Sequence, residues 1–272
     1  MVNLSSICVI LALGGGAVLG VPALQIARPL DIQNSFLQYE EPKFLSGKIF
    51  SDDSERKKYL FRFTRQSTRS GQTLNVTREY SYPDGKLAAR EQLTYQGDNL
   101  VSYELEELQI GAQGAAQIRR DPLRPGKDRI LFEYSSDASS KSKSTDSEPL
   151  RNEILVNDMV APFLKTHYDE LMGGKEVKCR YIVVPRKETV GFTFKKQSGA
   201  SADTSRLVRI KMEATSPIIA ALIDPLYFTV EKDPPHRVLE YQGRTTPKLK
   251  SGSKWKDLDA VTVFDWPAER RP

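Results

Sequence analysis

Apolar side chains recur at every second position through most of this chain, from about Lys57 onward. Phe61 and Phe63 are spaced in this way, and the same spacing returns at Leu74 and Val76. A helix buries every third or fourth residue, whereas a strand with one buried face buries every second residue. The pattern therefore predicts a succession of strands that each have one apolar face.

Short turn motifs separate these segments. Residues 82–85 read Tyr-Pro-Asp-Gly and residues 96–99 read Gln-Gly-Asp-Asn, and Pro, Asp, Asn and Gly are the residues that tight turns favour. Strands joined by tight turns pair antiparallel, and we expect about ten to twelve of them. The predicted fold is mainly β: a large antiparallel meander that forms a curved sheet or open (half) barrel with two short helices.

The two helices are expected where the alternation stops. Asn157 and Asp158 offer an N-cap to a short amphipathic helix that ends at the glycines 173–174. Ser216 and Pro217 begin a second one, whose residues 218–223 read IIAALI. A helix this short buries four large apolar side chains only if a cavity or a partner receives them, although it would also suit the closed end of a barrel.

The first 23 residues have the form of a secretory signal peptide. Residues 7–23 are uncharged and end in a small-residue site with Val21 and Ala23, which predicts cleavage after Ala23. The leading MVNLSS carries no Lys or Arg, so an uncleaved membrane anchor over residues 7–27 stays open. Cleavage would leave Cys179 as the only cysteine, and export without a disulfide favours a bacterial periplasm.

The remaining chain divides by composition into one domain with flanking segments. Residues 24–56 are expected to form an N-terminal extension and the first strand, 57–266 a single antiparallel β domain, and 267–272 a tail. Within the domain, residues 135–148 are rich in Ser and charge and are predicted to be a flexible loop.

The composition excludes several kinds of chemistry. The chain has two His and two Cys, and no HExxH, CxxC, phosphate-loop or GxSxG motif occurs. Cys179 is expected in the core and His167 at the edge of a helix. Adjacent carboxylates such as Glu106 and Glu107 point to opposite faces of a strand. Such a pair cannot face one cavity together, so it does not suit acid and base catalysis on a glycan. We predict no catalytic residue, metal or cofactor, while a glycan-acting enzyme with carboxylates distant in sequence remains the least favoured alternative.

Aromatic residues are concentrated on the expected strands. Core packing accounts for such a pattern, and the alternative is a curved sheet that closes incompletely around a lipid-sized cavity, with residues 218–223 as its plug or lid. On that hypothesis the ligand-binding residues are Ile218, Ile219, Leu222, Ile223, Phe61, Phe63, Tyr95, Tyr103 and Phe132.

The formal net charge is +5, and basic residues are scattered, with one group at Lys248, Lys250, Lys254 and Lys256. Solvated surfaces explain most of this charge, and contact with an anionic membrane surface is the sharper interpretation. Nucleic acid is disfavoured by the export signal. We expect a monomer.

The order of these elements resembles the periplasmic open-barrel proteins, which include the LolA/LolB lipoprotein carriers and related uncharacterised envelope families. The resemblance covers most of residues 40–266 as architecture, and the absence of a lipobox matches the LolA-like members. It implies a concave sheet that holds acyl chains or lipoprotein. The expected function is therefore that of a non-enzymatic exported envelope protein that binds a hydrophobic ligand; the alternative is a structural or interaction protein of the cell envelope with a filled core.

Overall fold

The structure is a computed structural model that describes residues 43–52, 56, 58–121, 123–124, 126–137, 143–151, 154–199 and 206–266. The expected signal peptide, the alternative membrane anchor over 7–27 and the tail at 267–272 lie outside the described residues.

The described residues form one sheet of fifteen strands. The predicted mainly β fold is therefore confirmed, with more strands than the alternation indicated. The strands are β1 (Phe44–Ser51), β2 (Tyr59–Ser70), β3 (Thr73–Ser81), β4 (Leu87–Gln96), β5 (Asn99–Glu107), β6 (Ala112–Arg119), β7 (Arg129–Ser135), β8 (Ser144–Pro149), β9 (Ile154–Leu155), β10 (Val177–Val183), β11 (Glu188–Lys196), β12 (Leu207–Ala214), β13 (Leu226–Glu231), β14 (Val238–Ser251) and β15 (Lys254–Asp265).

The strand order is that of two meanders joined at one junction. The first runs from β1 to β8 and the second from β9 to β15, and every neighbouring pair follows in sequence except β1 and β15. At that junction β1 pairs antiparallel with β15, with Ile49 opposite Thr262. The pairing of β9 with β10 is parallel, whereas the other pairs are antiparallel. The turns predicted at 82–85 and 96–99 connect β3 to β4 and β4 to β5.

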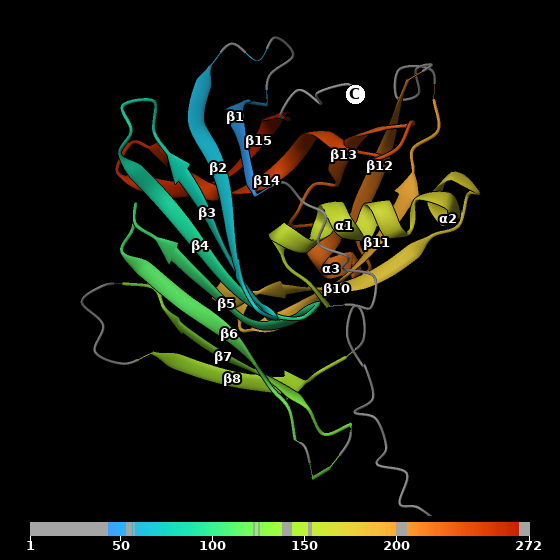
Figure 1. Cartoon of the computed structure of the whole chain (residues 1–272). Coiled ribbons are helices and arrows are strands. Elements are labelled where there is room, and N and C mark those ends of the chain that lie inside the picture. Colours follow the sequence, from blue (N-terminus) through green and yellow to red (C-terminus); the bar gives the residue numbers. More distant parts are fainter. Residues whose placement is uncertain are drawn as a thin grey trace, which may run out of the picture.

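The sheet curves until its two ends approach each other without joining (Figure 1). Gly114 on β6 lies so close to the opposite meander that a Cβ atom there would come within 2.6 Å of Val184 Cγ1. The backbone N–H of Thr189 on β11 donates to the Glu148 side chain on β8 at 3.1 Å. The two meanders are therefore held together on this side by contacts that involve side chains, and β8 and β9 do not pair with each other. The curved, unclosed sheet agrees with the expected open barrel.

The helices are short and differ from the prediction in number. They are the 3₁₀ turn η1 (Asn157–Met159), α1 (Val160–Thr166), α2 (Tyr168–Met172), the 3₁₀ turn η2 (Val184–Arg186) and α3 (Pro217–Ala220). The helix expected from Asn157 is thus broken at His167, and its N-cap is Val156 with no side-chain hydrogen bond. Asn157 and Asp158 do not cap it because both side chains enter buried polar contacts described below. Phe163 and Leu164 of α1 are fully buried against the concave face of the sheet.

The predicted flexible loop was wrong at its C-terminal boundary. Residues 144–148, placed in the loop 135–148, belong to β8, which pairs with β7 with Ser147 opposite Leu131. Both faces of this edge strand are largely exposed, so it needs no apolar alternation and is held by backbone hydrogen bonds. Alternation is also missing at the end of the β14–β15 hairpin, where Leu249, Lys250 and Ser251 are all exposed although the two strands pair there.

Candidate functional site

A cavity of about 660 Å³ lies inside the curve of the sheet, between the two meanders and the helices. Cavities of roughly 300–1,000 Å³ are typical of sites for small molecules. Most of the wall is apolar, with Phe63, Phe192, Met212, Ile219, Leu222 and Phe228 among its members. The cavity is therefore large enough, and apolar enough, to take a lipid-sized molecule.

Five of the nine side chains predicted to bind ligand line this cavity. They are Phe63, Tyr103, Ile219, Leu222 and Ile223. Ile219 is buried, whereas Leu222 is 66 % exposed and lies at the opening. The segment 218–223 therefore contributes part of the wall, although only residues 217–220 are helical.

The other four predicted residues do not line the cavity. Ile218 is 76 % exposed, because successive residues of a helical turn point in different directions and cannot all face one side. Phe61 belongs to a second core cluster and packs on Tyr82, with ring centroids 5.0 Å apart. Phe132 is buried in the main core. Tyr95 is fully buried, and its hydroxyl donates to Asp158 at 3.2 Å.

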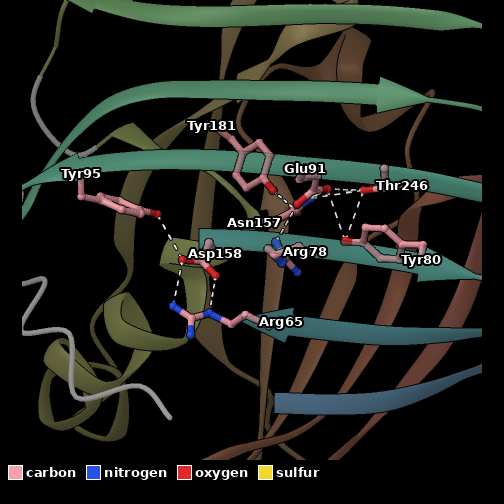
Figure 2. A network of polar contacts seen from close by, with 9 residues as sticks. All are labelled: Arg65, Arg78, Tyr80, Glu91, Tyr95, Asn157, Asp158, Tyr181 and Thr246. Atoms are coloured by element: carbon pink, nitrogen blue, oxygen red, sulfur yellow. Dashed lines mark hydrogen bonds and ion pairs between the residues drawn. The ribbon is translucent and has the colours of Figure 1, made fainter. Parts of the chain in front are cut away.

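One side of the cavity carries a buried ion pair between neighbouring strands (Figure 2). Arg78 on β3 stands opposite Glu91 on β4, and its Nη1 donates to Glu91 Oε2 at 3.0 Å. Glu91 is fully buried and its Oε1 accepts three more hydrogen bonds: from the Tyr80 hydroxyl at 3.3 Å, Asn157 Nδ2 at 2.7 Å and Thr246 Oγ1 at 2.5 Å. This carboxylate therefore joins strands of both meanders to η1.

A second buried ion pair lies beside the first. Arg65 on β2 donates from Nε to Asp158 Oδ1 at 2.7 Å and from Nη2 to Oδ2 at 3.4 Å (Figure 2). The two side chains are 4 % and 1 % exposed. Because the Tyr95 hydroxyl also donates to this carboxylate, η1 is fixed to both β2 and β4. Asp158 therefore positions the helical segment over the concave face and does not cap it.

Four tyrosines of the polar side of the cavity, Tyr80, Tyr103, Tyr181 and Tyr241, carry phenols that stay neutral at ordinary pH. Burial is the largest cause that raises the pKa of each of them, so the charged phenolate is disfavoured. Tyr181 donates to Asn157 Oδ1, and Tyr241 donates to the Arg244 carbonyl. Each of the four side chains therefore keeps its hydroxyl proton and takes part in hydrogen bonds as a neutral phenol.

The two carboxylates of the cavity wall outside this network share one ammonium group. Lys248 Nζ lies 3.2 Å from Glu107 Oε1 and 2.8 Å from Asp257 Oδ1. The hydrogen bond from Lys248 lowers the pKa of Asp257, whereas a general acid for glycoside cleavage needs a raised pKa. Arg244 adds ion pairs to Asp257 and Asp259, each at 2.9 Å. Each of these three carboxylates therefore has a cationic partner, and Glu107 and Asp257 are held by the same ammonium group.

Comparison with known proteins gives a weak structural likeness. No family model and no curated protein matches the chain. Among solved structures, the chain is similar to the crystal structure of a beta-barrel-like protein of domain of unknown function DUF1849 from Brucella abortus. The two chains are 8 % identical with a TM-score of 0.37, over 82 % of this chain and 94 % of that one. This likeness is too weak to assign a ligand or an activity.

The described residues also show whether a metal site or a membrane-spanning helix is present, and where Cys179 and His167 lie. Within the described residues, no three His, Cys, Asp or Glu side chains gather in a way that would hold a metal ion. None of the described helices is long and apolar enough to cross a membrane. Cys179 is buried in the core, as predicted. His167 lies between α1 and α2, where its Nδ1 is 3.1 Å from Glu170 Oε1.

The charged residues on the polar side of the site were not predicted from the sequence. Arg65, Arg78 and Glu91 were not singled out, and Asp158 was assigned only a capping role. A signal for the first three is present in the alternation itself, because each occupies a position in phase with buried neighbours such as Phe63. A charge at a buried position of a strand requires a partner, and that requirement marks a polar site.

Proposed function

We propose that this protein binds an apolar or amphiphilic ligand of lipid size in the cavity inside its curved sheet, and that it does so without catalysing a reaction. The observation that supports this most directly is the 660 Å³ cavity with its mainly apolar wall. Each methylene group that such a wall removes from water contributes about 0.8 kcal/mol. A structural protein with a filled core is the weaker alternative, because it gives no reason for a cavity of this size.

The resemblance to LolA/LolB-type carriers agrees with this proposal in architecture only. Export and cleavage after Ala23 stay predictions, since these residues lie outside the described part of the chain. Proteins of that kind hold acyl chains in a concave sheet, which is the same physical arrangement proposed for this cavity.

Leu222→Asp tests the proposal at the opening of the cavity. The side chain lines the cavity yet is 66 % exposed, so the change should leave the fold intact. A carboxylate there would have to lose water when an apolar ligand covers it. We expect the affinity for N-phenyl-1-naphthylamine, an uncharged apolar fluorophore, to fall by about tenfold or more in a fluorescence titration.

Ile218→Asp is the matched control for this experiment. It makes the same chemical change four residues earlier, on a side chain that is 76 % exposed and does not line the cavity. Its affinity for the fluorophore should stay that of the unmodified protein. Equal affinity in all three proteins, or equal loss in both variants, would contradict binding in this cavity.

The end of the β14–β15 hairpin supports an additional proposal, contact with an anionic membrane surface. Lys250, Lys254 and Lys256 are exposed there, and no described residue forms an ion pair with them. Trp255 lies beside them, with Lys250 Nζ 5.8 Å from its ring centroid. A cluster of cations with an aromatic side chain suits the interface of an anionic bilayer.

Replacing these three lysines together by glutamine should weaken binding to phosphatidylglycerol vesicles by about a hundredfold, since each contributes about 1 kcal/mol near such a surface. Vesicle sedimentation at low salt measures it, with phosphatidylcholine vesicles as the uncharged reference.

The control triple variant carries Lys86→Gln, Lys127→Gln and Lys178→Gln, which are exposed positions elsewhere. It lowers the net charge by the same amount. If both triple variants lose binding equally, overall charge and not the hairpin is responsible, and this proposal fails.

A further inference from the structure

Tyr103 carries a hydroxyl group without a protein partner. The residue is 5 % exposed, lies on β5 opposite Leu93 of β4 and Ala116 of β6, and lines the cavity. Within the described residues no group forms a hydrogen bond with its hydroxyl, whereas the Tyr80, Tyr181 and Tyr241 hydroxyls all have one. The hydroxyl oxygen is not among the fully enclosed unpartnered atoms, so it opens onto the cavity, where a hydrogen-bonding group of a bound molecule can become its partner.

Arg78, two strands away, is also only partly satisfied. Its guanidinium group offers five N–H donors, and in the described part of the chain only Nη1 has an acceptor, Glu91. Nε is enclosed by the protein and has no partner among the described residues. One face of the group lies over the Phe63 ring at 5.1 Å. Arg78 is 9 % exposed and forms part of the cavity wall, so Nη2, which is not enclosed and has no acceptor among the described residues, is the donor that it offers on the same polar side as Tyr103.

The acceptors around these two residues are already occupied. Glu91 accepts from four donors, and Asn157 Oδ1 accepts from Tyr181. The polar side of the cavity therefore has donors to spare and few acceptors. The Tyr103 hydroxyl can donate or accept, whereas the guanidinium group of Arg78 can only donate, so a ligand group that pairs with both must bring an acceptor oxygen. A cationic head would be repelled by the guanidinium group. Because Glu91 balances the charge of Arg78, the acceptor need not be ionised.

We propose that Tyr103 and Arg78 form the head-group subsite of this cavity, and that it takes the carbonyl-type oxygen of an amphiphile, either a carboxylate or an ester. The proposal rests on the function proposed above and adds the chemistry of the ligand. The apolar tail then extends over Phe192, Phe228 and Ile219 on the opposite wall. The polar and apolar parts of the cavity thus match the two ends of one molecule.

Tyr103→Phe tests the subsite with three probes that share one tail: dodecanoic acid, methyl dodecanoate and dodecylammonium. The variant should fold normally, because the lost hydroxyl donates to no described residue. We expect it to bind the acid, the ester or both about three- to tenfold more weakly than the unmodified protein does, and to bind the ammonium ion unchanged. Loss for the acid alone identifies a carboxylate head, and loss for the ester identifies a neutral one.

Tyr95→Phe is the matched control. It also removes one buried hydroxyl, but this one donates to Asp158 and does not line the cavity. Its melting temperature should fall while its affinities for all three probes stay unchanged, the reverse of the result expected for Tyr103→Phe. Binding of the acid and ester by Tyr103→Phe with unchanged affinity would overturn the head-group subsite alone. If the unmodified protein binds none of the probes, the proposed function fails and the subsite with it.

Discussion

Replacing Glu91 by glutamine is expected to lower the free energy of unfolding by about 3–5 kcal/mol, which is the usual cost of leaving a buried charge without its partner. The amide cannot balance the charge of Arg78. If its oxygen keeps the Oε1 contacts, its NH₂ group faces the Arg78 donor, and if it is flipped, the NH₂ group faces the donors of Tyr80, Asn157 and Thr246. Glu91 is fully buried, so water cannot take over these contacts. Urea denaturation followed by circular dichroism measures the change.

The neighbouring register pair provides the control for this prediction. Glu79 on β3 stands opposite Arg90 on β4, one residue along from the Arg78–Glu91 pair and on the other face of the sheet. Its ion pair with Arg90 is 3.0 Å long, and both side chains are more than a third exposed. Glu79→Gln should therefore cost less than about 1 kcal/mol. Similar losses for the two variants would contradict the role assigned to burial.

Alkaline pH is expected to destabilise the protein steeply, because Tyr80, Tyr103, Tyr181 and Tyr241 all have raised pKa values in the folded state. Burial is the main cause in each case. Unfolded tyrosines lose their proton near pH 10, whereas the folded ones keep it. Their contribution to stability is therefore fully present below about pH 10 and is lost as pH rises above it. Between about pH 10 and 11 the loss is about 1 kcal/mol per tyrosine, about 4 kcal/mol for these four.

Urea denaturation at a series of pH values measures this loss, and the ultraviolet absorbance of phenolate follows the titration directly. Burial and Glu107 also raise the pKa of Tyr134, which makes five such phenols. In Tyr103→Phe one of the five is absent, so the fall in stability above pH 10 should be about a fifth less steep. If all tyrosines of the folded protein ionise near pH 10, the burial of these phenols in the structure is contradicted.

The strands and turns were predictable because their determinants are local. The alternation of Leu74 and Val76 with polar residues decides which face of β3 is buried, and a Pro-Asp-Gly turn decides where the chain reverses. Where both faces of a strand are exposed, as in β8, no alternation exists and the strand cannot be found by this means.

The lining of the cavity was predictable only in part. Alternation places Phe61, Phe63, Tyr95 and Tyr103 among the buried residues. It does not show which of these side chains are covered by other side chains and which face an open cavity. Phe61 and Tyr95 lie where the core is filled, while Phe63 and Tyr103 border the cavity. Tyr95 is enclosed because η1 packs there and its Asp158 accepts the hydroxyl, whereas Phe61 is enclosed by Tyr82 and the second core cluster. Both are tertiary properties.

The buried charges were missed for a related reason. The sequence analysis took charge to indicate solvent, yet Arg65 and Arg78 occupy inward positions of their strands. Arg65 finds its partner in Asp158, which is 93 residues away in sequence. A pattern read within one strand cannot identify such a partner, although it does show that one is needed.

The junction between β1 and β15 has a consequence for the order of events in folding. Every other pair of neighbouring strands joins segments that follow each other along the chain, so each meander can assemble from contacts that close short loops. The pairing of Ile49 with Thr262 instead spans nearly the whole domain, and its partner strand is the last to be synthesised. We expect two partly formed half-sheets to appear early and the seam between them to form last, which makes this seam the slow step by which the protein acquires its single continuous sheet.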